Sequence, residues 1–265
     1  MNINQNIILN YTVTMNKAFV IVLGLILSVN LASSQITKSH VHQVSLNFLQ
    51  IKDEMNYGLV FRGLGIGYTY SAQWQNEKRL LEYEARLSYS LMDTREIIAG
   101  SFNVVPVRLG YLLKTGTQSK LCVGPFFTTE YNYELYPDVQ SGYSFWFTHF
   151  SLGSVLSYSF NLQKNLFDLS FHTTLLGITS RQPVYHDPYF FDLNPWYVLR
   201  FVHQDFQFGS LDQYNQSELE IRWQPKAKSR LALAYALQYY GYFDSPKLTM
   251  INHSAKLIIL PKKEK

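Results

Sequence analysis

The chain has 265 residues and a net charge of +4, with 23 Lys and Arg against 19 Asp and Glu. Charged residues make up 16% of it, below the roughly 25% of average soluble domains, and aromatic residues make up another 16%. The single cysteine, Cys122, excludes a disulfide framework within the chain, and no spacing of Cys and His predicts a metal site. The modest, dispersed charge also argues against a nucleic-acid partner.

The N-terminal segment has the pattern of a secretory signal. Met15, Asn16 and Lys17 precede an apolar run, residues 18–29, and small residues follow at Ala32 and Ser34. The run is shorter than the roughly 20 residues that a membrane helix needs, which argues against an anchor. We therefore predict an N-terminal extension and signal peptide over residues 1–34, cleaved before Gln35, and a single exported domain over residues 35–265.

The exported part alternates between apolar and polar residues. From Leu81 to Leu91, apolar residues occupy the odd positions, and Glu82, Glu84, Arg86, Ser88 and Ser90 occupy the even ones. This period of two predicts β-strands. Similar alternation covers residues 41–51, 105–113, 121–133, 146–160, 167–175, 218–223, 231–239 and 252–260, with turn-forming clusters such as 75–78 and 161–165 between strands.

Three features favour a membrane barrel over the alternative, a soluble sandwich or lipocalin-like barrel. Many strands are long enough to cross a bilayer, and the polar faces combine charges of both signs with small residues such as Ala232 and Ala234. Aromatic residues gather near strand ends, at 131–133, 145–147 and 239–243, as in the girdles of membrane barrels. We predict an all-β, antiparallel transmembrane barrel of about 10 to 12 strands with a partly filled lumen. A direct count gives an odd number of strands, and residues 197–208 are the doubtful strand.

Over the whole exported part, this pattern resembles the small outer-membrane β-barrel proteins of Gram-negative bacteria. The resemblance implies residence in the bacterial outer membrane, contact with its lipid and insertion by the outer-membrane assembly machinery. It implies no single activity, and the sequence indicates no cofactor.

One motif suggests chemistry. In the segment 148–153, His149 lies two residues before Ser151, so both side chains share one strand face, where the imidazole could activate the hydroxyl. The spacing is similar to the His-x-Ser arrangement of outer-membrane phospholipase A and of lipid A deacylases, which implies His149 as base and Ser151 as nucleophile. Those families usually place asparagine after the serine, where this chain has Leu152. The alternation also turns Phe150 and Leu152 to the lipid, which favours a polar pair inside the lumen.

Other polar side chains share that predicted interior. If residues 161–165 form a hairpin turn, His172 and Thr174 come close to Gly153 and Ser151. Opposite charges in a narrow lumen would pair, or would form an ion-selective constriction. The predicted lumen cluster consists of His149, Ser151, His172, Thr174, Glu82, Glu84, Arg86, Arg108, Glu218, Glu220 and Arg222.

Three classes of function follow. We favour a non-enzymatic barrel, either a narrow or plugged pore or a scaffold whose external loop, residues 182–196, binds a partner protein or ligand. The second is a lipid hydrolase, in which Ser151→Ala abolishes fatty-acid release. The third is an accessory subunit of an export or uptake complex, which would co-purify with another outer-membrane protein in mild detergent.

Overall fold

The computed structural model describes residues 37–56, 58–95, 97–115, 120–137, 143–181, 206–225 and 229–261. The predicted signal peptide and the predicted binding loop, residues 182–196, lie outside these ranges. The strands are β1 (Thr37–Asp53), β2 (Val60–Gln75), β3 (Arg79–Asp93), β4 (Ile98–Lys114), β5 (Leu121–Tyr136), β6 (Tyr143–Leu162), β7 (Asn165–Arg181), β8 (Gln207–Ser210), β9 (Tyr214–Gln224), β10 (Leu231–Tyr242) and β11 (Leu248–Ile259). A short 3-10 turn, η1 (Glu54–Asn56), follows β1, and no described helix is long and apolar enough to cross a membrane.

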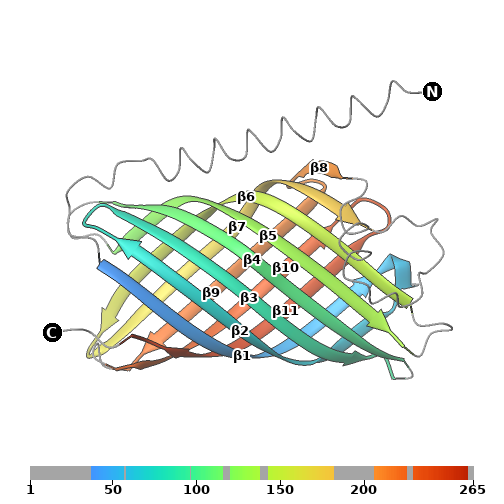
Figure 1. The fold of residues 1–265 in the computed structure, drawn as a ribbon, viewed down its shortest axis with the longest axis horizontal. Helices are drawn as coiled ribbons and strands as arrows, with labels where there is room; N and C mark the ends of the chain where they lie inside the picture. The colour runs from blue at the N-terminus through green and yellow to red at the C-terminus, as the bar shows by residue number, and fades with distance from the viewer. Residues whose placement is uncertain are drawn as a thin grey trace. The chain divides into compact units, whose positions relative to one another are not determined.

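The described strands form a closed antiparallel barrel (Figure 1). Sequential neighbours pair from β1 to β7, β7 pairs with β9, and β9, β10 and β11 lead back to β1. This ring of ten strands confirms the predicted barrel and its even strand number. The short β8 is the odd strand: it pairs with β7 beside the ring, and residues 197–205 of the doubtful segment lie outside the described ranges.

The two ends of the barrel differ in their connections. β1 and β11 are antiparallel neighbours, with His42 opposite Ile259, so the start of β1 and the end of β11 lie together at what we call the terminal end. The connections between strands at this end span two to six residues, the shortest being 163–164, whereas the longest connection, 182–206, joins strands at the opposite, loop end. Because outer-membrane barrels have short periplasmic turns, the terminal end is the periplasmic one.

The barrel is apolar outside and polar inside. On β1 the side chains of Gln43, Ser45 and Asn47 are buried, while Leu46 is 67% exposed. The same inversion holds on β10, where Ala234 is buried and Leu233 is exposed. A soluble barrel would bury the apolar face, so this pattern excludes the soluble alternative and identifies the exterior as the lipid-facing surface.

The hairpin of β6 and β7 is tighter than predicted. Leu162 pairs with Asn165, and the two-residue turn between them holds Gln163 at a φ of 57°. Thr174 therefore lies opposite Gly153, and His172 lies opposite Val155. The pair Thr174–Gly153 confirms the predicted proximity of these residues, and the turn needs only two residues rather than the longer segment that its composition suggested.

Several aromatic residues predicted for the membrane girdle lie inside the barrel instead. Phe147, Tyr240 and Tyr242 are buried, because they share the inward-facing parity of His149 on β6 and of Ala236 on β10. They belong to an apolar cluster at the loop end, which we call the aromatic plug: Leu49, Ile51, Phe61, Met92, Ala99, Tyr136, Phe147, Tyr214, Tyr240, Tyr242, Leu248 and Met250. The exposed aromatics include Tyr68, Tyr89, Phe102 and Tyr158.

Candidate functional site

Charged side chains from β3, β4, β9 and β11 meet in the middle of the lumen. Arg108 Nη1 lies 2.9 Å from Glu218 Oε2 and 3.5 Å from Glu84 Oε1. Arg86 Nη1 lies 3.6 Å from the same Glu218 oxygen. We call the connected set the ion cluster: Glu84, Arg86, Arg108, Glu218, Glu220 and Lys256.

Lys256 is a member that the sequence analysis did not single out. Its Nζ lies 2.5 Å from Glu220 Oε2 and 3.6 Å from Glu218 Oε1. The alternation of the last strand could have identified Lys256 as a lumen residue. Lys256 lies on the same inward-facing side of the strand as Ser254, while Leu257 faces the lipid. Charges with so little exposure would be costly alone, so their mutual pairing compensates the loss of water and links strands across the barrel.

A second ion pair lies closer to the terminal end. Arg222 donates through Nε (2.8 Å) and Nη2 (2.6 Å) to Asp168 Oδ2, and Ser159 Oγ donates to Asp168 Oδ1 at 2.5 Å. Asp168 was not among the predicted residues. Glu82, which was, accepts a hydrogen bond from Gln73 Nε2 at 2.8 Å, and no Lys or Arg of the described residues lies within ion-pair distance of it.

On the loop side of the ion cluster, His149 belongs to a network of hydrogen bonds. Its Nε2 donates to Gln216 Oε1 (2.9 Å), and Gln216 Nε2 donates to Glu130 Oε2 (2.6 Å). Asn103 Nδ2 completes the network by donating to Glu130 Oε1 at 2.5 Å. The imidazole also stacks on the ring of Tyr240, with 5.2 Å between the centroids.

The placement of His149 and Ser151 bears on the hydrolase hypothesis. His149 is fully buried and Ser151 is 2% exposed, on the lumen face of β6. The hydrogen bond of the imidazole goes to Gln216 rather than to the hydroxyl. Thr174 bonds the backbone of Gln216, with its Oγ1 accepting from Gln216 N at 2.9 Å. A lipid hydrolase of this type presents its pair to the membrane, so this geometry offers no support for one.

An ion pair lies beside the aromatic plug at the loop end. Arg181 Nη2 lies 2.8 Å and 2.7 Å from the two carboxylate oxygens of Asp53, and Arg181 Nη1 donates to the carbonyl oxygen of Pro246. The guanidinium carbon also lies 5.2 Å from the ring centroid of Tyr242. This pair joins the ends of β1 and β7 with the loop between β10 and β11.

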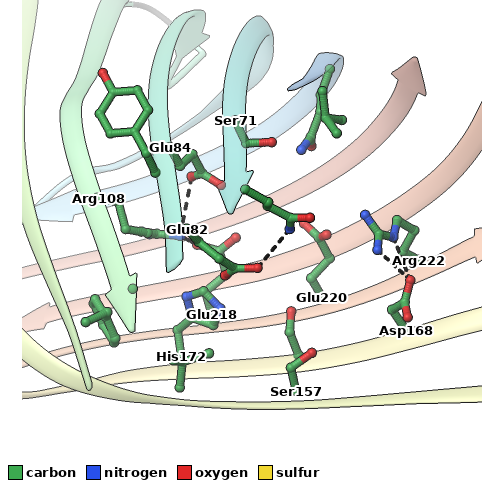
Figure 2. Close-up of a pocket in the computed structure, with 18 residues that line it drawn as sticks. Ser71, Glu82, Glu84, Arg108, Ser157, Asp168, His172, Glu218, Glu220 and Arg222 are labelled. Carbon is green, nitrogen blue, oxygen red and sulfur yellow. Dashed lines mark hydrogen bonds and ion pairs between the residues drawn. The ribbon is translucent and has the colours of Figure 1, made fainter. Parts of the chain in front are cut away.

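Two cavities of the described lumen border the ion cluster. The terminal cavity, of about 120 Å³, is lined by residues that include Arg108, Glu218 and Glu82 (Figure 2). The second, of about 40 Å³, lies on the loop side and is lined by Arg86, Lys256 and others. The ion cluster separates them, because its members line both and bond one another. Within the described ranges, no group of three or more His, Cys, Asp or Glu could hold a metal ion.

Comparisons with known proteins give matches among solved structures alone. No protein-family model matches the sequence, and no curated protein matches it. Among solved structures, the chain is similar to the translocator domain of the autotransporter NalP from Neisseria meningitidis, at 7% identity and a TM-score of 0.49 over 95% of this chain and 96% of that one. It is also similar to the outer membrane protease OmpT from Escherichia coli, at 8% identity and a TM-score of 0.42 over 87% of this chain and 99% of that one. The inverted polarity of its closed barrel makes this chain an outer-membrane β-barrel.

Proposed function

We propose that this outer-membrane barrel is a closed, non-enzymatic scaffold rather than an open pore. The observation that carries the proposal is the filled lumen. The aromatic plug occupies the loop end, the ion cluster crosses the middle, and the cavities around the cluster measure only about 120 Å³ and 40 Å³.

The arrangement of the charges distinguishes a closed lumen from a selective pore. Charged rings that select ions line an aqueous path, and the passing ion interacts with their free charges. Here the carboxylates and cations of the ion cluster face one another at 2.5–3.6 Å. A passing ion would have to break these pairs and then displace the buried rings of Phe147 and Tyr240. The two barriers in series support a barrel that does not conduct.

If the lumen is closed, the function of the barrel lies on its surface. Functional residues often lie on loops that a rigid frame positions. The frame brings Arg181, at the end of β7, and the start of β8 to the loop end, and the predicted partner-binding segment 182–196 lies between them in the sequence, outside the described ranges. We place the binding of a partner protein or surface ligand at this end. A role as accessory subunit of a larger complex would use the same surface.

Single-channel recording in planar bilayers tests the proposal. The wild-type protein should give no current steps, because both barriers are closed. A combined variant, Phe147→Ala, Tyr240→Ala, Arg108→Ala and Glu218→Ala, removes side chains from both barriers and should conduct. The matched control Leu233→Ala removes a lipid-facing side chain and should stay silent.

Folding is checked in each sample by the heat-dependent mobility shift of intact barrels on gels. Discrete ion steps from folded wild-type protein would contradict the proposal. So would steps from Leu233→Ala of the same size as those of the combined variant.

A further inference from the structure

The terminal cavity differs from the rest of the lumen in the balance of its charges. Five carboxylates line it, those of Glu82, Glu84, Asp168, Glu218 and Glu220, together with the guanidinium groups of Arg108 and Arg222. Figure 2 shows these side chains around one space. Cations pair with Asp168, Glu218 and Glu220 at distances of 2.5–2.9 Å, and Arg108 lies 3.5 Å from Glu84. Glu82 accepts a hydrogen bond from the neutral amide of Gln73 at 2.8 Å, and no cation of the described residues lies within ion-pair distance of it.

A buried amide oxygen in the same cavity lacks a donor among the described residues. Gln43, on β1, lines the cavity and is only 8% exposed, and its Oε1 has no hydrogen-bond partner among the described residues. A buried amide oxygen without a donor costs about 1–3 kcal/mol, so a group that supplies an N–H there is favoured. The cavity therefore combines a carboxylate without a cation and a carbonyl without a donor.

The cavity opens toward the terminal end. Side-chain exposure rises from 6% at Arg108, in the ion cluster, to 22% at Glu84 and 28% at Arg222, near the end of β9. On the loop side the ion cluster closes the space. A solute would therefore enter from the periplasmic side and could not pass through.

We infer that the terminal cavity binds a small organic cation that carries N–H donors, of the alkylammonium class. The ammonium group gives the Glu82 carboxylate a counter-charge, and the amide oxygen of Gln43 lines the same cavity as an acceptor without a donor among the described residues. A bare metal ion fits less well, because no described group of acidic or histidine side chains has metal-binding geometry. The volume of about 120 Å³ lies a little below that of an engineered cavity that holds benzene, which limits the guest to a few heavy atoms.

Titration of the folded, full barrel in detergent micelles with ethylammonium chloride tests this inference. We expect saturable binding at millimolar concentration by calorimetry, with shifts of the side-chain amide resonances of Gln43 and Gln73. Ethanol, which has the size but no charge, and tetramethylammonium, which has the charge but no N–H, should give neither signal.

Two variants locate the site. Glu82→Gln removes the unpaired charge and should weaken binding about tenfold or more, because a charge-assisted hydrogen bond is lost. Gln43→Leu removes the acceptor and should also weaken binding. The control Glu77→Gln makes the same charge change in the exposed turn at the same end of the barrel, and should bind as the wild type does.

Three results would overturn the inference. They are the absence of saturable binding to folded wild type, equal binding of tetramethylammonium, and unchanged affinity in Glu82→Gln. If Glu82→Gln does not fold, Gln43→Leu decides alone, and wild-type affinity in that variant rejects the site. Binding does not depend on the scaffold role, so conductance and binding results are separate.

Discussion

Glu218 is the residue on which the ion cluster depends. Its carboxylate receives Arg108 at 2.9 Å, and Arg86 and Lys256 each lie 3.6 Å away. Removing one partner of a buried pair leaves the other charge without compensation, which costs about 3–5 kcal/mol. Several cations of the described lumen lie around this one carboxylate. Its removal should therefore lower the free energy of unfolding more than the removal of any single cation.

We therefore expect Glu218→Gln to lower the free energy of unfolding by about 3–5 kcal/mol. Denaturant titration of the micelle-bound barrel, followed by tryptophan fluorescence, measures this change. The exposed control Glu77→Gln should change it by no more than about 0.5 kcal/mol. Equal unfolding midpoints for the two variants would show that the ion cluster does not stabilise the barrel.

For single residues, the sequence predicts which face of a strand a side chain lies on better than it predicts which other side chain it contacts. Alternation alone assigns Glu82, Glu84, Arg86 and Glu218 to the interior, because a strand has only two faces. It does not say which charges meet. Arg181 and Asp53 are separated by 128 positions in the chain, and only the closure of the barrel brings them together.

Strands β2 and β3 approach each other closely at Gly63. A Cβ added at Gly63 would collide with the backbone carbonyl oxygen of Leu91, on the paired strand. A backbone atom of a ladder cannot move aside as a flexible side chain can. The absence of a side chain at Gly63 is therefore needed for this pairing.

We expect Gly63→Ala to reduce the fraction of barrel that folds into vesicles and to lower its stability, as seen by the heat-dependent gel shift and by denaturant titration. Gly100→Ala is the matched control, since its added Cβ would meet the ring of Tyr89 at an ordinary 3.4 Å. If both variants fold with the same yield and stability, the close approach of β2 and β3 at Gly63 does not affect the folding or the stability of the barrel.

Strand existence was predictable and strand detail was not. The predicted turn around residues 75–78 is present, where Asn76 Oδ1 accepts a hydrogen bond from the backbone N–H of Arg79 at 2.7 Å. The turn between β6 and β7 was placed correctly but is shorter than predicted, since composition marks a turn without fixing its length. β8 spans only Gln207–Ser210, which is too short for a period of two to identify.

For the molecule as a whole, the sequence predicted the barrel, its membrane setting and a narrow lumen. It did not predict the aromatic plug, because aromatic residues near strand ends suit both a girdle and an interior cluster. The odd or even position of an aromatic residue along its strand distinguishes a girdle from an interior cluster only once the bounds of that strand are known. The closed lumen follows from this inward placement of the aromatic residues, and of the two predicted roles, a narrow or plugged pore and a scaffold, it favours the scaffold.

All of these conclusions depend on which face of each strand meets the lipid, and β1 provides the most direct test. Single-cysteine variants at positions 43 to 48, made in a Cys122→Ser background and spin-labelled in vesicles, report collisions with oxygen, which concentrates in the bilayer. We predict high oxygen accessibility at positions 44, 46 and 48 and low accessibility at 43, 45 and 47. The opposite phase, or no alternation at all, would contradict the inside-out barrel and every lumen contact built upon it.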